Sequence, residues 1–432
     1  MLLGQGRSAV AGALVEAEAQ FARALDQIAT LPATPALRRE QINSQVAIIT
    51  PLLHVKGYAA PEAKAAVERA RLLIEQAAAI GEPPQDPLLL FSVLYGSWVA
   101  NYAAFSGAMM RELAAQFLAL AQRGTAIVPV MVGHRLAGIS FLCTGDFAQA
   151  RMHFDRALTL YNPTEHRALA TRFGADVRVA TLFYRSWALW VLGYPHSGLA
   201  DSERALHDAR EIGQAATLMN TLTITGLRHI FCGDYAGAGR LTDELVGLSD
   251  EKGAAFWKTV GLLLRGCLFT LTGRSAEAVQ IIAAGLAAFR STGATLFVPG
   301  FLSYLAKAYA DTGQFESASR CIGEAMKAIG TTGESWFEAE AHRIAGEIEL
   351  MQGEPDAAQA EVCFERALAI ARAQQAKSWE LRAATSLARL WQNQHKCDEA
   401  CALLAPVHHW FTEGFESLDL KEAKSLLNSL GA

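Results

Sequence analysis

The sequence predicts an all-α fold: a superhelix, or solenoid, of about nine stacked helical hairpins. Three features predict it: glycines that recur every 40 residues, a second set of glycines offset by 20 residues, and small side chains at fixed distances from the first set. Repeat periods of roughly 20–50 residues are typical of solenoids, in which each unit buries its apolar face only against its neighbours. One glycine is weak evidence, but two interleaved sets with a single period favour this fold.

Both sets of glycines are predicted to end helices. A residue in the left-handed backbone conformation commonly terminates a helix, and glycine adopts that conformation without a steric penalty. The first set falls in the turn inside each hairpin and consists of Gly193, Gly233, Gly273, Gly313 and Gly353. The second set ends the following helix and consists of Gly213, Gly253, Gly293 and Gly333. Further turns inside hairpins are predicted at Gly57, Gly107, Gly145 and His395.

Small residues recur on both helices of each predicted hairpin. A small residue on each of two consecutive helices lets their axes approach closely, as a tight antiparallel pair requires. Seven residues before the turns stand Ala100, Gly138, Ser186, Gly226, Gly266, Ala306, Gly346 and Ala388. Five residues after the turns stand Ala150, Gly198, Ala238, Ala278, Ala318 and Ala400, with Ala360 two residues late because of an insertion at 353–357.

These positions resemble the tetratricopeptide repeat (TPR). That repeat has a small residue on its first helix, a Gly-x-aromatic turn, an Ala on its second helix, and then a bulky residue and another Ala, as in Phe154 with Ala157 and Phe364 with Ala367. The resemblance implies helix pairs stacked into a TPR-like solenoid. The sequence departs from the family in its period, 40 residues rather than roughly 34, and in having glycine where the repeat usually ends with proline.

The organisation along the chain is predicted as one solenoid over residues 1–432. Residues 1–85 form irregular N-terminal repeats, residues 86–192 further irregular repeats, and residues 193–432 regular repeats with a C-terminal cap. The helix predicted at residues 12–28 looks like the second helix of a hairpin whose first helix is missing. Since a solenoid unit cannot bury its apolar face alone, this suggests a chain cut from something longer.

Composition argues against two kinds of partner. The net charge of -5 and a pI near 6.1 are unsuited to a nucleic-acid surface, which needs a positive potential. Residues 87–110 lack charge and are long enough to span a bilayer. Serines, glycines and Asn101 lower the hydrophobicity of this segment, and it keeps the phase of the repeat, so a buried helix fits better.

The seven scattered cysteines form no CxxC pair. This is the usage of a reducing compartment, so we expect a cytoplasmic protein.

Three segments resemble a more particular family. Residues 86–96 (DPLLLFSVLYG), 133–136 (GHRL) and 376–384 (AKSWELRAA) are similar to the C-terminal repeat region of bacterial multidomain signalling proteins. In those proteins a class III adenylate/guanylate cyclase domain is followed by an AAA-type ATPase domain and then by TPR-like repeats. The resemblance runs from about Arg7 to Leu430. It implies a role in signal transduction, and it places any cyclase or ATPase activity in domains to which no residues here correspond.

Motifs for catalysis or metal binding are missing from the sequence. There is no P-loop, nucleophile elbow, His-Glu-x-x-His or EF-hand pattern. The nearest approach to a metal site lacks the tight knuckle of structural zinc sites, so buried cysteines and surface histidines are the preferred interpretation of its residues: His395, Cys397, Cys401, His408 and His409. We therefore expect no enzyme activity, no cofactor and no metal.

A partner is expected to bind the inner face of the first helix of each hairpin. Positions 13, 10, 6 and 3 residues before the turns define this face. The candidate groove residues are Arg135, Phe183, Trp187, Trp190, Asn220, Lys307, Arg343, Arg382 and Arg389. The predicted groove changes from aromatic to charged, so it suits a protein or peptide segment with apolar anchors at one end and carboxylates at the other. For Trp187 and Trp190, packing between repeats remains an open alternative.

Two functions are weighed against each other. The first is a non-enzymatic protein-interaction or regulatory module, and the alternative is a sensor whose superhelix encloses a small ligand and controls an attached ATPase or cyclase. An open, partly charged groove would favour the first, and a deep, mostly apolar pocket the second. A fixed aromatic stripe is assigned to packing between hairpins: Trp257, Phe297, Phe337 and Trp379.

Overall fold

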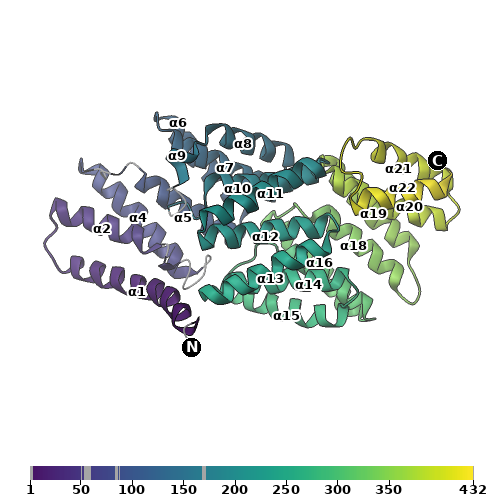
Figure 1. Cartoon of the computed structure of the whole chain (residues 1–432), viewed down its shortest axis with the longest axis horizontal. Helices are drawn as coiled ribbons and strands as arrows, with labels where there is room; N and C mark the ends of the chain where they lie inside the picture. Colours follow the sequence, from purple (N-terminus) through teal and green to yellow (C-terminus); the bar gives the residue numbers. More distant parts are fainter. Residues whose placement is uncertain are drawn as a thin grey trace.

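The computed structural model describes residues 3–49, 51, 52, 60–82, 86, 88–167 and 172–431. Over these residues the chain consists of helices and turns, with no strand. Figure 1 shows the helices paired side by side and stacked into an elongated superhelix, from α1 at one end to α22 at the other. The predicted all-α solenoid is confirmed.

The described part of the chain contains nine helical hairpins, and we name their first helices A and their second helices B. The A helices are α2 (Pro35–Ala47), α5 (Leu89–Ala103), α7 (Ile127–Cys143), α10 (Val177–Val191), α12 (Ala215–Phe231), α14 (Ala255–Leu271), α16 (Val298–Asp311), α18 (Glu338–Met351) and α20 (Lys377–Asn393). The B helices are α4 (Pro61–Ala79), α6 (Gly107–Gln122), α8 (Phe147–Leu160), α11 (Pro195–Ile212), α13 (Tyr235–Lys252), α15 (Ser275–Ser291), α17 (Phe315–Thr332), α19 (Ala357–Ala373) and α21 (Cys397–His409).

Three further helices of the described chain lie outside these nine hairpins. α1 (Leu3–Ala29) precedes the first hairpin, packs against α2 and also contacts α13, while α22 (Leu418–Leu430) packs against α20 and α21. The short α9 (Pro163–His166) occupies the long connection between α8 and α10. Among the helices that the structure describes, none has both the length and the apolar character needed to cross a membrane.

The predicted glycine turns are found in the left-handed conformation. Gly193, Gly233, Gly273 and Gly313 end A helices with φ between 75° and 90°, and the second set behaves alike, with Gly213 at 69° and Gly333 at 75°. Two predicted turns differ. Gly107 is the first residue of α6, and the residue with positive φ in that turn is Phe105. At Gly353, α18 ends at Met351 and a longer turn follows, where the two-residue insertion was expected. After it the left-handed positions are held by non-glycine residues, Gln375 and His395. The turn predicted at Gly57 lies outside the described residues.

The small positions allow the two helices of a hairpin to pack closely. A Cβ atom on Gly138 would lie 2.4 Å from the ring of Phe154, and one on Gly266 would lie 2.4 Å from Cγ1 of Ile282. Such separations are well inside van der Waals contact, so any larger side chain would push the helices apart. Gly226 occupies the same repeat position, but the nearest atom to its Cβ would be 3.9 Å away.

These two glycines give a matched test of hairpin packing. Gly266→Ala should destabilise the protein by about 1–3 kcal/mol, because the added methyl overpacks the interface with Ile282. Gly226→Ala should be neutral or stabilise the protein by up to about 1 kcal/mol. Alanine has less backbone freedom than glycine in the unfolded chain, and its methyl group fits beside Gly226's neighbours in the folded protein. Thermal unfolding followed by circular dichroism measures both variants. Equal melting temperatures would contradict the packing argument.

Successive turns of the superhelix are joined through backbone carbonyls. The last carbonyls of a helix have no partner within it, and here they accept hydrogen bonds from a hairpin five places later. Ala103 O at the end of α5 accepts from Thr295 N (2.9 Å) and Leu296 N (3.2 Å), just before α16. Cys143 O at the end of α7 accepts from Ser335 N (3.2 Å), just before α18. One superhelical turn therefore takes five hairpins.

The same relation continues along the stack. Trp190 O in α10 accepts from the Ser378 hydroxyl in α20 at 2.5 Å. Phe231 O at the end of α12 accepts from the Arg382 guanidinium in α20, four hairpins later, at 2.6 Å. Leu418 of α22, the next helix after the ninth hairpin, packs on the adjacent Gly233. The turn glycines leave the space for these contacts, because a Cβ on Gly233 would lie 2.7 Å from Leu418.

Candidate functional site

Two hollows of substantial size lie along the inner faces of the A helices in the part of the chain that the structure describes. The first, which we call the apolar chamber, has a volume of about 120 Å³ and is lined from α5, α7, α10, α12, α14 and α16. The second, the charged chamber, has a volume of about 170 Å³ and is lined from α12, α14, α16, α18, α20 and α22. Either volume is roughly ten times the space that one water molecule needs, so each can hold ligand groups.

A cluster of buried aromatic rings, the aromatic wall, separates the chambers. It consists of Trp187, Trp190, Phe231, Phe297, Trp336, Phe337 and Trp379. Trp187 meets Trp336 edge to face at 4.5 Å between ring centroids, and Trp190 meets Trp379 at 4.7 Å. Such pairs contribute about 0.5–1.5 kcal/mol each beyond their buried area. The wall therefore fastens α10 to the segments of α18 and α20 one superhelical turn later.

The aromatic candidates from the sequence lie in or next to this wall. Trp187, Trp190 and Phe183 are all at most 2% exposed, and none of them lines either chamber. Their burial matches the alternative interpretation, packing between repeats. Of the aromatic stripe, Phe337 and Trp379 belong to the wall, Phe297 belongs to the wall and also lines the apolar chamber, and Trp257 lines that chamber.

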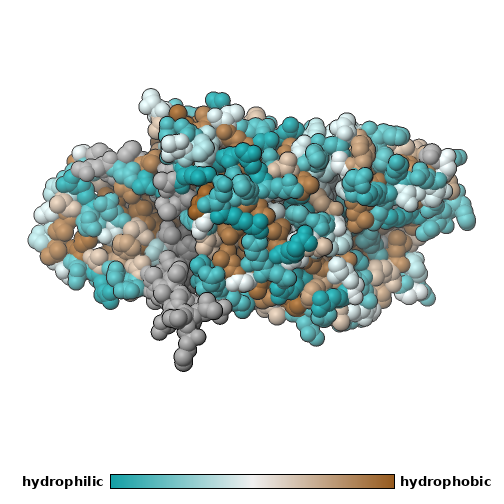
Figure 2. Space-filling model, in the orientation of Figure 1, coloured by the Kyte–Doolittle hydropathy of each residue, from teal (hydrophilic) through white to brown (hydrophobic). Residues whose placement is uncertain are grey.

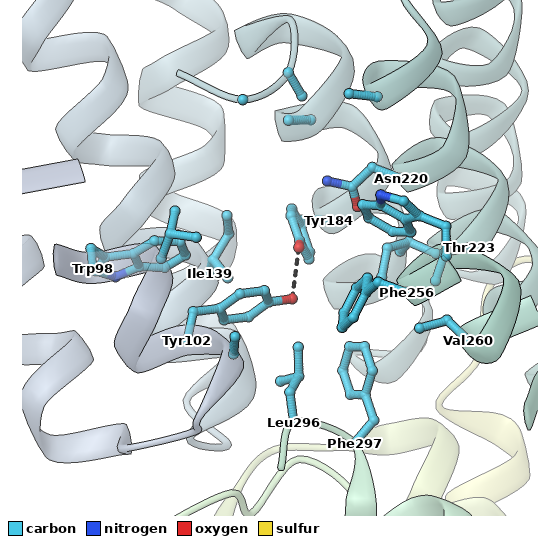
Figure 3. Close-up of a pocket in the computed structure, with 18 of the residues that line it drawn as sticks. Trp98, Tyr102, Ile139, Tyr184, Asn220, Thr223, Phe256, Val260, Leu296 and Phe297 are labelled. Carbon is cyan, nitrogen blue, oxygen red and sulfur yellow. Dashed lines mark hydrogen bonds between the residues drawn. The ribbon is translucent and has the colours of Figure 1, made fainter. Parts of the chain in front are cut away.

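The apolar chamber is built around two tyrosines. The hydroxyls of Tyr102 (α5) and Tyr184 (α10) lie 2.7 Å apart and point at each other across it, as Figure 3 shows. Trp98 stacks on Tyr102 at 5.1 Å and donates its indole N–H to Ser140, so this side is held rigidly. Burial raises the pKa of both tyrosines, and the hydroxyls stay protonated.

Asn220 supplies a free polar group in the same chamber. It comes from α12, and Figure 3 shows its amide directed between Tyr184 and Phe256. The amide has no hydrogen-bond partner among the residues that the structure describes. Asn220 is partly exposed, so its amide is available to hydrogen-bond a ligand group in the chamber.

Arg135 from α7 is the charged residue of this chamber. It is 2% exposed, and its guanidinium donates to the carbonyls of Phe173 (3.0 Å) and Ala175 (3.4 Å) and lies 5.5 Å from the Tyr95 ring centre. Its Nε–H has no hydrogen-bond partner. No carboxylate of the described chain pairs with it, in contrast to the arginines of the other chamber.

The charged chamber brings together four of the predicted basic residues, and each already has an acidic partner. Lys307 pairs with Asp311 (3.1 Å), Arg343 with Glu340 (2.7 Å), Arg382 with Asp419 (3.0 Å) and Arg389 with Glu422 (2.9 Å). The repeat pattern in the sequence predicts these cations in the groove but does not predict Asp419 and Glu422. Groove positions were counted back from the predicted turns, and α22 follows the last of them. Arg135 and Asn220 lie in the other chamber.

A buried ion-pair network forms the floor of the charged chamber. Glu340 accepts hydrogen bonds from both Arg343 and Arg382, and Arg382 also lies over the rings of Trp190 and Trp379. Burial acts to raise the pKa of Glu340, but the two guanidinium groups outweigh it and lower that pKa below its ordinary value. The network is complete without a ligand, so it fixes the chamber's shape.

Glu334 anchors the aromatic wall from the turn before α18. One carboxyl oxygen, Oε1, accepts both the backbone N–H of Phe297 and the indole N–H of Trp336, each at 2.8 Å. Phe297 has the left-handed backbone angle φ of 64°, which is unusual for a bulky residue, and the hydrogen bond from its N–H helps to hold it there. Burial raises the pKa of Glu334 to about 8, so the group is largely protonated at neutral pH.

This raised pKa predicts a pH-dependent stability. In the unfolded chain Glu334 loses its proton near its ordinary pKa of about 4.3, whereas the folded protein keeps it until about pH 8. Stability is therefore highest below the unfolded pKa and falls between the two values, by at most about 1.4 kcal/mol per pH unit. Glu334→Gln, which mimics the protonated form, should gain melting temperature relative to wild type as the pH rises from 5 to 8. The surface variant Glu324→Gln serves as control, and a wild type and Glu334→Gln with parallel pH profiles would contradict the assignment.

Comparison with known proteins identifies the fold. No protein-family model matches the sequence, and no curated protein matches it. The structure is similar to that of a Rap protein complexed with Competence and Sporulation Factor, with a TM-score of 0.59 and 13% identity over 90% of this chain and 99% of that one. The chain has a TPR-like solenoid fold. Weaker similarity is found to the apo form of the quorum sensor NprR from B. thuringiensis (TM-score 0.48, 12% identity, 85% of this chain and 98% of that one) and to yeast Tom70 (0.39, 12%, 98% and 96%).

Proposed function

We propose that the chain is a non-enzymatic regulatory module that binds a protein or peptide segment inside its superhelix. One observation carries the proposal: the superhelix makes complete turns, and the inner faces of the A helices therefore line two partly open chambers. The Rap protein of similar fold was solved in complex with Competence and Sporulation Factor, which supports a binding role for such a solenoid.

The rim of the charged chamber is the part best suited to a peptide. Arg389 and Glu422 are each nearly half exposed, and Lys307 is about one-quarter exposed. Exposed ion pairs contribute only about 0–1 kcal/mol, so charged groups of a partner can replace them at small cost. Arg343 and Glu340 are buried and fully engaged, and they would support the rim. The partner should present carboxylates to Lys307 and Arg389.

A peptide-binding experiment tests this proposal. Acidic peptides that bind the immobilised protein would first be selected from an array. The double substitution Lys307→Ala with Arg389→Ala should then weaken the affinity about 5- to 20-fold, because two charge-assisted contacts are lost. Isothermal titration calorimetry measures the change. Arg290→Ala is the matched control, since Arg290 forms a similar exposed pair with Glu324 (2.7 Å) on the B helices. Equal losses in both variants, or an array without binders, would contradict the proposal.

The alternative function, a small-ligand sensor, is favoured by the apolar chamber. This chamber is lined mainly by aromatic side chains, with a few polar groups, as small-molecule sites usually are. Binding there and binding at the charged rim use different residues. The two functions can therefore be tested separately on one protein.

The signalling context is a narrower proposal that rests on sequence alone. Residues 86–96, 133–136 and 376–384 resemble repeats that follow cyclase and ATPase domains. We propose that the module regulates such domains. Affinity purification of the tagged chain from its native cells, followed by mass spectrometry, should recover a cyclase–ATPase protein. Recovery of unrelated partners only would remove this context while leaving the binding function untouched.

A further inference from the structure

The apolar chamber contains a buried positive charge without a counter-charge. Among the described residues no carboxylate pairs with Arg135, and its guanidinium contacts two backbone carbonyls and both the ring and the hydroxyl of Tyr95. An ion taken out of water into a site of low dielectric constant loses several kcal/mol of hydration unless an opposite charge is close. The arginines of the charged chamber meet this requirement with Glu340 and Asp419. Arg135 lacks the corresponding partner.

We propose that the apolar chamber binds a small carboxylic acid with an apolar body, whose carboxylate pairs with Arg135. The inference rests on the proposed binding function of the superhelix interior but concerns the chamber that a peptide at the charged rim does not use. Arg135 has five N–H donors; the Nη atoms donate to two carbonyls, and the Nε–H has no partner among the described residues, so donors remain for the acid. A single positive charge suits a carboxylate, whereas a doubly charged phosphate would keep an unpaired charge in an apolar site.

The rest of the chamber defines the body of the ligand. Tyr102, Phe256 and Leu296 converge on the hollow from three sides in Figure 3, so the body is apolar and has flat faces. Asn220 can both donate and accept hydrogen bonds, so we expect a second polar group, such as a hydroxyl or carbonyl, away from the carboxylate. A basic ligand is excluded by the charge of Arg135.

We place the entrance to the chamber on the side of α12 and α14, where lining residues are partly exposed. Asn220 and Phe256 are partly exposed, while Arg135 at the inner end is buried. In Figure 2, hydrophilic side chains cover most of the visible face, and apolar side chains show between them over the middle of the molecule. The acid would therefore enter with its carboxylate first and leave its apolar end nearer the opening.

Matched acids and amides test the proposal on the unmodified protein. Decanoate, 4-phenylbutyrate and indole-3-propionate would be titrated beside their neutral amides, with thermal shift and quenching of tryptophan fluorescence as readouts, because Trp98 and Trp257 line the chamber. At least one acid should bind saturably, about tenfold or more tightly than its amide, because only the acid pairs with the guanidinium. Equal binding of acid and amide, or no saturable binding of any acid up to millimolar concentration, overturns the proposal.

Variants assign the binding to Arg135. Arg135→Gln should abolish the preference for acid over amide, and Arg135→Lys should retain part of it if the glutamine variant fails to fold. Asn220→Ala should weaken indole-3-propionate and its amide a few-fold, because among these probes only the indole has a second polar group for Asn220 to contact. Arg228→Gln is the matched control: Arg228 is 3% exposed and bonded to the Pro195 carbonyl, but it lines neither chamber, so acid preference should persist. Acid preference that survives in Arg135→Gln overturns the assignment.

Two further comparisons separate the source of the acid and the two binding proposals. Hydrophobic peptides with a free C-terminus would be compared with their amidated forms. This comparison shows whether a peptide carboxylate can take the place of a small acid. If the protein prefers the peptides over every small acid, the proposed class of ligand is wrong. The variant Lys307→Ala with Arg389→Ala should bind the small acid with unchanged affinity. Peptide binding at the charged rim can fail while acid binding persists, or the reverse, so the two proposals fail independently.

Discussion

The superhelix depends on the backbone carbonyls that each A helix leaves unpaired at its C-terminal end. A buried carbonyl without a partner is costly, and at the ends of α5 and α7 the partner comes from five hairpins later. Trp190 O of α10 accepts from Gly193 N and takes a further bond from Ser378, also five hairpins later, and Phe231 O of α12 accepts from Arg382, four hairpins later. Because these helix ends recur once per hairpin, the contact repeats in register and sets five hairpins per turn. The turn glycines serve the same contact, since a side chain at Gly145 or Gly193 would collide with the segment above it. In contrast, Gly273 and Gly313 have no atom within 4 Å of their Cβ positions.

The pitch of the superhelix determines what its interior can bind. A more open solenoid would present one continuous groove, but here the rings of α10 and α12 meet rings just before α18 and within α20, and these rings lie between the two chambers. The same repeat positions then line two different chambers. Tyr184 and Asn220 face the apolar one, and Arg343 and Arg389 face the charged one. The change from aromatic to charged along the sequence thus becomes a change from one chamber to the next.

Sequence periodicity predicts those parts of the structure that arise from neighbouring segments. Gly266 packs closely on Ile282 within one hairpin, so the small residue that this contact requires recurs in the 40-residue pattern of the sequence. The bond from Ser378 to the carbonyl of Trp190 joins residues 188 apart, and no local pattern marks it. Helical phase predicts Trp190 on the inner face of its helix, but it could not show that residues one superhelical turn later bury its side chain. The same limit explains why one groove was predicted where the structure has two chambers.

The aromatic wall gives the two chambers a shared set of contacts. Phe297 lines the apolar chamber, and its N–H is held by Glu334, which also holds the indole of Trp336. The carbonyl of Trp336 accepts the indole N–H of Trp379 at 3.2 Å, and Arg382 of the charged chamber lies over the Trp379 ring. A ligand that displaces Phe297 must therefore strain this chain of contacts or shift it as far as Arg382. Coupling free energy between two sites is reciprocal. If a ligand in the apolar chamber changes the affinity for a partner that draws Arg382 away from the wall, that partner changes the affinity for the ligand by the same factor.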